Sequence, residues 1–305
     1  MSEVGIESAG PAVGSVEHRQ LLARFFVESH VRYVPESIEW PVLEDAERER
    51  LVGLPFWQEA VSTENRTSNT VAAAAALEPD PQLRRAIELQ GFEEQRHASL
   101  LVALTSHYRI PVVRPPRFEP HSLEHDFLFA GFGECFDSFF AFGLFAVART
   151  SGYFSPALVE IFEPVVQEEA RHILFFVNWV KYRRSLLPWW RRPLFRARCA
   201  WIILEQVASR AKTARSMGAR PQRQRENERK SEGENDRQGA NETSSDNFTL
   251  SAHQDLGESI TLHRLLQLCL SENERRLSAY DERLARPRLV PAIAKFLYRV
   301  LPARL

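Results

Sequence analysis

A short motif with acidic, basic and imidazole side chains occurs twice in this chain. Residues 92–97 read Phe-Glu-Glu-Gln-Arg-His, and residues 167–172 read Gln-Glu-Glu-Ala-Arg-His. In an α-helix, side chains three residues apart lie one above the other on the same face. The Glu and His three residues apart in each copy can therefore point at one metal ion.

The two motifs belong to a longer internal repeat. Residues related by an offset of 75 include His97 and His172, Glu94 and Glu169, Glu88 and Glu163, Arg96 and Arg171, and Pro81 and Pro156. The repeat therefore shares a helix start, a turn and a ligand-like motif. This pattern predicts two antiparallel helix pairs, related by a pseudo-twofold axis and joined by the proline-rich residues 111–120.

Two Glu-x-x-His helices in one bundle indicate a di-metal carboxylate site, in which each partner helix adds one carboxylate. Two cations a few ångströms apart need about four carboxylates to balance their charge, while one histidine caps each ion. Iron or manganese suits such an oxygen-rich set better than zinc, which favours fewer ligands and more sulfur. The motif ligands are predicted to be Glu94, His97, Glu169 and His172.

The carboxylate of the third bundle helix is predicted to be Glu134. It lies in a strongly apolar stretch, where an unpaired charge is costly. Asp137, about one turn further along, is the alternative or a hydrogen-bonding neighbour of the ligands.

The first bundle helix offers two candidates. Glu59 lies 75 residues before Glu134, so the repeat nominates it, whereas helical phase favours Glu64, whose side of the helix carries the apolar residues. Five residues correspond to about 140° of rotation, so both cannot point inward. We favour Glu64 and keep Glu59 as the alternative.

The motif itself leaves one further choice. Glu93 and Glu168 precede their histidines by four residues, which also permits a shared face, but the three-residue spacing is the one known for such sites. Arg96 and Arg171 point away from the ligand face and can pair with Glu93, Glu168 or other acids, or face solvent.

Helix-start and helix-stop signals divide the chain into helical segments. Ser15 and Asp80 are predicted N-caps, Pro81 suits a first helical turn, and Gly152 is a predicted helix end. We expect helices at about 15–29, 43–52, 55–77, 81–108, 124–150 and 156–182, one that ends near 214, and a last pair at 259–285 and 289–301. Because no segment shows strand alternation, the fold is predicted to be all-α.

These segments suggest a domain organisation. We expect an N-terminal lead and helical extension in 1–50, a four-helix bundle in 51–185, an accessory helix in 186–215, a disordered polar insertion in 216–250, and a C-terminal helical pair in 251–305 packed on the bundle. The insertion is rich in Arg, Gln, Glu, Asn, Ser and Gly, a composition that cannot bury enough apolar surface to order itself.

The succession of Glu, Glu-x-x-His, Glu and Glu-x-x-His on four helices resembles the ferritin-like superfamily of non-haem di-iron carboxylate proteins. That superfamily includes ferritins, rubrerythrins, ribonucleotide reductase small subunits, aldehyde-deformylating oxygenases and arylamine N-oxygenases. The resemblance covers residues 55–182 and implies a ferritin-like four-helix bundle with additional N- and C-terminal helices. Two departures stand out: the chain has Val165 where arylamine N-oxygenases carry a third histidine, and it lacks the paired CxxC motifs of rubrerythrins.

The resemblance implies two bound iron ions, with manganese and iron as an alternative pair. It favours an oxidase or monooxygenase that activates O2 with electrons from a reductase or ferredoxin. The many phenylalanines of the third bundle helix suggest a small apolar or aromatic substrate. The alternatives are iron or peroxide handling without an organic substrate, as in ferritin or rubrerythrin, and a non-catalytic helical binding protein.

Composition limits the partners and the location. The net charge of −1 gives no field that would attract nucleic acid. The three cysteines are far apart and form no CxxC motif, which is typical of reduced thiols in a cytoplasmic protein. The most apolar window, residues 127–148, contains Glu134 and Asp137 and is therefore expected to be a buried bundle helix. Trp189–Arg192 and Lys295–Arg299 have an interfacial composition, so peripheral membrane contact is an alternative to the solvent exposure that we favour.

Overall fold

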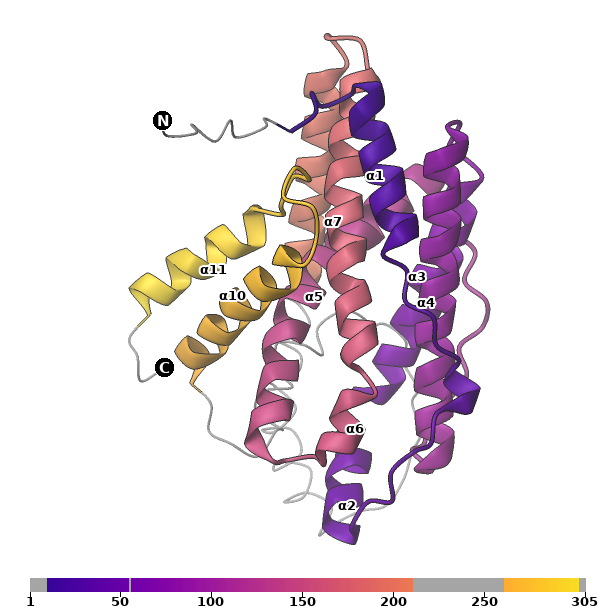
Figure 1. Cartoon of the computed structure of the whole chain (residues 1–305), viewed down its shortest axis with the longest axis vertical. Coiled ribbons are helices and arrows are strands. Elements are labelled where there is room, and N and C mark those ends of the chain that lie inside the picture. The colour runs from indigo at the N-terminus through magenta and orange to yellow at the C-terminus, as the bar shows by residue number, and fades with distance from the viewer. Residues whose placement is uncertain (1–9, 55, 211–260, 302–305) are drawn as a thin grey trace, which may run out of the picture.

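The computed structural model describes residues 10–54, 56–210 and 261–301, and every regular element within these ranges is helical (Figure 1). The predicted all-α class is thereby confirmed. The predicted polar insertion at 216–250 lies outside the described residues, as do the first part of the segment 251–305 and the end of the helix expected to reach residue 214.

Four long helices form the central bundle: α3 (Trp57–Ala75), α4 (Pro81–His107), α5 (Leu123–Ser151) and α7 (Glu163–Leu186). α3 packs against α4 and α5 packs against α7, while α3 also contacts α5 and α4 also contacts α7. The long helices run along the longest dimension of the molecule (Figure 1). The extended segment 108–122 connects α4 to α5, so the two halves of the repeat form two helix pairs that face each other.

The predicted capping residues form the expected local structures. The Asp80 side chain accepts hydrogen bonds from the backbone N–H groups of Gln82 and Leu83, with Pro81 at the first helical position. Gly152 follows α5 with a φ of +67°, a left-handed conformation that a side chain would disfavour. The Asp80 cap satisfies backbone N–H groups that the start of a helix leaves without partners.

The fourth bundle helix differs from the expectation of one continuous helix over 156–182. The chain forms a short helix α6 (Pro156–Glu160), turns at residues 161–162, and then begins α7. Pro164 explains the interruption, because proline has no N–H to donate to the carbonyl four residues earlier and its ring clashes with that carbonyl. Pro164 is instead accommodated in the first turn of α7.

Shorter helices surround the bundle. α1 (Val16–Glu28) lies against α4 and α7, and a 3-10 turn (Pro35–Ser37) also contacts α4. α2 (Asp45–Gly53) precedes α3. α10 (Leu262–Ser278) packs on α5 and α7, and α11 (Leu289–Val300) packs on α10 and α5. A further helix at residues 192–210 follows α7.

α5 is long and apolar enough to cross a membrane by length and composition alone, but 56% of its most apolar window is buried inside the bundle. Its glycines allow close packing: a Cβ at Gly131 would lie 2.3 Å from the Phe176 ring, and one at Gly143 would lie 2.3 Å from the Cys269 Sγ atom. α5 therefore packs tightly against α7 at Gly131 and against α10 at Gly143.

Candidate metal centre

Residues from all four bundle helices meet in the interior. Glu64, Glu94 and His97 form one group whose candidate ligand atoms all lie within 4.8 Å of one another, and Glu94, Glu134 and His172 form a second such group. Glu94 belongs to both groups. Buried Glu and His clusters of this kind could hold metal ions, because each offers carboxylate oxygens and an imidazole nitrogen to one point.

Glu169 also lies between the two histidines. Its Oε1 atom is 3.3 Å from Nδ1 of His97 and 3.9 Å from Nδ1 of His172. Glu94 has the same relation, with carboxylate oxygens 3.8 Å from Nδ1 of His97 and 2.8 Å from Nδ1 of His172. The Ser138 hydroxyl donates a 2.9 Å hydrogen bond to the other oxygen of Glu169. The two carboxylates of the repeated motif therefore occupy equivalent central positions.

Four buried polar atoms that face this centre form no hydrogen bond of regular geometry: Nδ1 of His97, Nδ1 of His172, Oε1 of Glu94 and Oε1 of Glu134. Two of them approach each other, with Glu94 Oε1 2.8 Å from His172 Nδ1. Leaving a buried polar atom unsatisfied costs about 1–3 kcal/mol. Several such atoms that converge on one point could bind a metal ion, because their donor types suit one.

Charge supports the same interpretation. Glu64, Glu94, Glu134 and Glu169 would carry four negative charges, and within the described part of the chain no Lys or Arg forms an ion pair with any of them. Burying uncompensated carboxylates is strongly unfavourable. Two divalent cations would neutralise this set.

The other glutamate of each motif supports a histidine of the opposite motif. Nε2 of His97 lies 2.8 Å from a Glu168 oxygen, and Nε2 of His172 lies 2.9 Å from a Glu93 oxygen. An Nε2–H group that donates to a carboxylate leaves Nδ1 as the free ligand atom. We call these four residues the crossed His–Glu pairs, because each joins one half of the repeat to the other.

Each supporting glutamate is neutralised by a buried arginine, again from the other half. Arg171 forms an ion pair with Glu93, and Arg96 forms one with Glu168. Arg171 is completely buried. Glu93 and Glu168 also come together with His30 in a potential metal-binding arrangement, but the two guanidinium groups already balance their charges, so we assign them a supporting role.

Residues of α1 and of the extended segment after it cover the supporting glutamates and arginines. His30 hydrogen-bonds Glu93, and the Tyr33 hydroxyl lies 3.4 Å from Glu168. The Phe26 ring lies 5.9 Å from the His172 ring, and its carbonyl accepts a hydrogen bond from Arg171. One short N-terminal segment therefore contacts the supporting residues of both halves and covers the centre.

Electrostatics distinguish the central Glu64 and Glu134 from the supporting Glu93. Burial, and next the charge of Glu94, raise the pKa of both Glu64 and Glu134 well above the ordinary value of 4.5. Burial alone would also raise the pKa of Glu93, but the hydrogen bond from His172 and the charges of His172 and Arg171 lower it to about 2. Glu93 is therefore charged at neutral pH, whereas Glu64 and Glu134 favour the protonated form in the metal-free protein.

Metal binding is accordingly expected to release protons. Burial opposes the charged form of both histidines, but hydrogen bonds and charges of the surrounding glutamates raise the pKa of His97 and His172 well above 6.5. A metal ion displaces protons from these groups and from Glu64 and Glu134, so affinity should rise with pH. We expect roughly one proton or more per ion, measured by titration calorimetry in buffers of different ionisation enthalpy. Binding without proton release would contradict this assignment.

The same groups fix how the metal-free protein responds to pH. A group whose pKa is higher in the folded than in the unfolded protein stabilises the fold at pH values below its unfolded-state pKa, which is about 4.5 for Glu and 6.5 for His. This stabilisation is lost as the pH rises through the pKa of the folded state. Glu93 acts oppositely, because its stabilisation is present above pH 4.5 and is lost as pH falls toward 2.

The alternative residues predicted from sequence lie elsewhere. Glu59 faces Thr63 and Arg66, whose side-chain atoms are 3.1 Å and 3.8 Å from its carboxylate, and it is in neither metal-binding group. Asp137 forms an ion pair with Arg210 of the helix at 192–210. Glu64, the residue favoured by helical phase, lies in the cluster. The six predicted ligands thus meet at one point, and their binding of metal stays a prediction.

Several residues of the site are not predicted by the sequence pattern. Gln90 is buried, donates a 3.4 Å hydrogen bond to Glu134, and leaves its own Oε1 atom without a partner. Gln90 lies one turn before Glu94, a spacing that could have identified it. His30 and Tyr33 lie in an extended segment outside the repeat, where no periodic pattern marks them.

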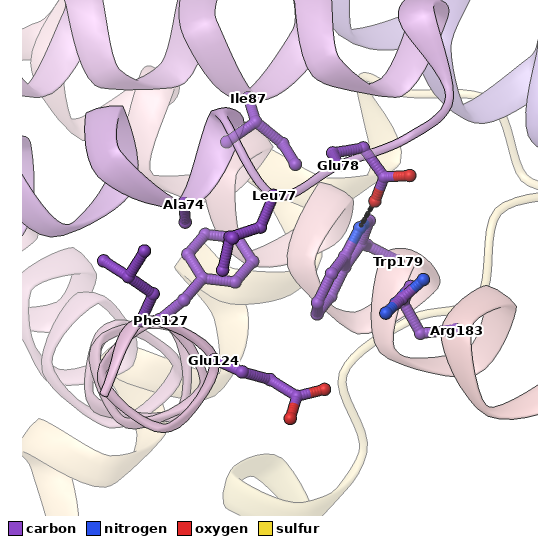
Figure 2. A pocket seen from close by; sticks show the side chains of 9 residues that line it. Ala74, Leu77, Glu78, Ile87, Glu124, Phe127, Trp179 and Arg183 are labelled. Carbon is purple, nitrogen blue, oxygen red and sulfur yellow. Dashed lines mark hydrogen bonds between the residues drawn. The ribbon is translucent and has the colours of Figure 1, made fainter.

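A cavity of about 270 Å³ opens near one end of the bundle (Figure 2). Its wall includes Leu77, Ile87, Phe127 and Trp179, and Glu124 and Arg183 add charged groups. The Trp179 indole N–H donates to the Glu78 carboxylate, as the dashed line in Figure 2 shows. Other phenylalanines of α5, including Phe139 and Phe142, are buried core residues.

Comparison with protein-family models, with curated proteins and with solved structures finds no match to this chain.

Proposed function

We propose that this chain is a di-iron oxidoreductase that activates O2, with the ferritin-like arrangement that its sequence resembles. The observation that carries the proposal is the position of Glu94, which belongs to both metal-binding groups. A carboxylate shared by two adjacent sites is what a pair of cations a few ångströms apart requires. The buried nitrogen and oxygen atoms without hydrogen bonds at the same point support it.

The residues divide into two equivalent sets. Glu64 and His97 would hold one ion, Glu134 and His172 would hold the other, and Glu94 and Glu169 would contact both. Four carboxylates and two imidazoles are an oxygen-rich set that suits iron or manganese. When bound, two ferrous ions supply the two electrons with which O2 is first reduced.

The chain's own residues orient the ligands and exclude water. Glu168 and Glu93 hold the Nε2 protons of the two histidines, which fixes both rings and directs Nδ1 at the centre. Ser138 fixes Glu169 through its hydroxyl. In a monooxygenase reaction, a substrate C–H group, O2, two electrons and two protons are converted to a C–OH group and one water molecule. The electrons come from an external reductase or ferredoxin.

The cavity in Figure 2 is our proposed substrate site. Ile87, Phe127 and Trp179 in its wall each lie seven residues from a proposed ligand on the same helix, namely Glu94, Glu134 and His172. Seven residues are two helical turns, so the cavity lies about 10 Å from the metal centre on the same helix faces. Its largely apolar wall favours a small apolar or aromatic substrate.

Metal analysis of the purified full chain, followed by anaerobic reduction and exposure to O2, tests the proposal. We expect two iron ions per chain and an absorption change on adding O2. A protein that carries no iron after growth with iron would overturn the proposal. Repeated oxidation of added ferrous ions into a mineral would instead favour the ferritin-like alternative.

A further inference from the structure

The helix at residues 192–210 has an apolar outer face as well as an apolar inner one. Phe195, Cys199 and Ile202 face the protein, and Cys199 and Ile202 are buried. The opposite side, with the exposed Arg196 at its edge, carries eight exposed apolar residues: Pro193, Leu194, Ala197, Ala200, Trp201, Leu204, Val207 and Ala208. The exposed fractions of Leu194, Trp201 and Leu204 are 67%, 62% and 61%. An ordinary surface helix would carry charged residues there.

Three charged residues of this helix hold it against α5. Arg198 forms an ion pair with Glu124, Glu205 pairs with His125, and Arg210 pairs with Asp137. These contacts fix which side of the helix faces outward. The apolar outer face is therefore set by ion pairs on the flanks and inner side of the helix.

The turn before this helix adds exposed tryptophans. Trp189 and Trp190 have exposed fractions of 80% and 52%, and the Arg191 guanidinium lies 4.6 Å from the centre of the Trp190 ring. Tryptophan is enriched where one end of a side chain meets lipid and the other meets water. Exposing two adjacent tryptophans to water alone is unfavourable.

This region is strongly basic. Residues 170–204 contain no Asp or Glu. Besides the buried Arg171 and the ion-paired Arg198, they contain the cations Lys181, Arg183, Arg184, Arg191, Arg192 and Arg196. Arg191, Arg192 and Arg196 are exposed. In a symmetric dimer the same outer face of a second copy would offer no acidic residue to pair with these cations. The phosphates of anionic lipids would supply the negative charge.

We propose that the Trp189–Arg192 turn and the helix at 192–210 seat the protein reversibly on an anionic lipid bilayer. The outer face would lie in the boundary between headgroups and acyl chains, with the exposed arginines at the level of the phosphates. α11 has a similar composition: Leu289, Ile293, Phe296 and Val300 are exposed at helical spacing beside Lys295 and Arg299. Membrane binding does not require the metal centre, so the metal-free protein should bind as well.

Sedimentation of the full chain with vesicles tests the proposal, using phosphatidylcholine alone or mixed with phosphatidylglycerol. We expect binding to the mixed vesicles that weakens with salt. Trp201→Glu and Leu204→Glu should each lower the partition constant about tenfold or more, because each removes a large apolar side chain from the boundary. Arg191→Gln and Arg192→Gln should each lower it about fivefold.

Val113→Glu is the matched control, because Val113 is 76% exposed but lies in the segment between α4 and α5. It should bind like the unchanged protein, and circular dichroism should show that all the variants keep their helices. Failure to bind the mixed vesicles would overturn the proposal, as would undiminished binding of both Glu variants. Light scattering that finds a dimer, dissociated by Trp201→Glu, together with no vesicle binding, would assign this face to a second copy instead.

Discussion

Glu94→Ala is expected to lose more bound metal than Glu64→Ala or Glu134→Ala. Glu94 is the carboxylate that belongs to both metal-binding groups, whereas Glu64 and Glu134 each belong to one. Glu64→Ala and Glu134→Ala should therefore each lose about half of the bound iron, and Glu94→Ala and Glu169→Ala should each lose half or more. Iron content per chain, measured by plasma emission on protein purified in parallel, gives the comparison.

The fold should survive these substitutions. In the metal-free protein the central carboxylates disfavour one another's ionisation, so removing one relieves this unfavourable interaction as well as leaving a small cavity. Glu59→Ala is the matched control: Glu59 is on the same helix as Glu64, but outside the cluster, and its variant should keep its iron. Unchanged iron in both Glu94→Ala and Glu169→Ala would refute the metal centre.

Glu93→Gln is expected to weaken metal binding and to destabilise the fold, although Glu93 is not a proposed ligand. The substitution removes the carboxylate that orients His172 and neutralises Arg171, which is completely buried. Loss of such a supporting carboxylate typically lowers metal affinity about 10- to 100-fold. Leaving one charge of a buried pair uncompensated costs about 3–5 kcal/mol. Urea unfolding of the metal-free protein and competitive metal titration measure the two effects.

A double-mutant cycle tests the crossed arrangement directly. Glu93→Gln combined with Arg171→Met should recover much of the lost stability, because no unpaired buried charge then remains. Combination with Arg96→Met should be close to additive, since Arg96 pairs with Glu168. Glu88→Gln is the matched control: its ion pair with Arg85 is exposed, so we expect a change below about 1 kcal/mol. Strong coupling of Glu93 to Arg96 but not to Arg171 would contradict the structure.

Local patterns predicted most of the helices and the inward positions on them. Caps such as Asp80 and Gly152 act through neighbouring residues, so they can be read from the sequence. Helical phase identified Glu64 as the inward residue, because the apolar residues of α3 mark the buried side. The 75-residue repeat placed the two histidine motifs at equivalent positions of two helix pairs, because a repeated motif in a repeated helix pair points in the same relative direction.

The sequence could not predict the contacts between residues that are far apart along the chain. Periodicity shows that Glu93 and Arg96 can be buried, but not that each pairs with a residue of the other half. His30 approaches Glu93 from an extended segment that carries no helical pattern. The break before α7 could have been predicted from Pro164, which a helix interior does not tolerate. The outward direction of Trp201 depends on ion pairs with α5, and these also join distant parts of the chain.

The crossed His–Glu pairs have a consequence for biosynthesis. α3 and α4 leave the ribosome before α7, yet the carboxylate that holds His97 and the arginine that neutralises Glu93 both belong to α7. The early half can bring its apolar side chains together, but its buried charges gain their crossed partners only after another 71 to 79 residues have been made. Neither half is self-sufficient, so the bundle should form in one cooperative step that awaits the later helix.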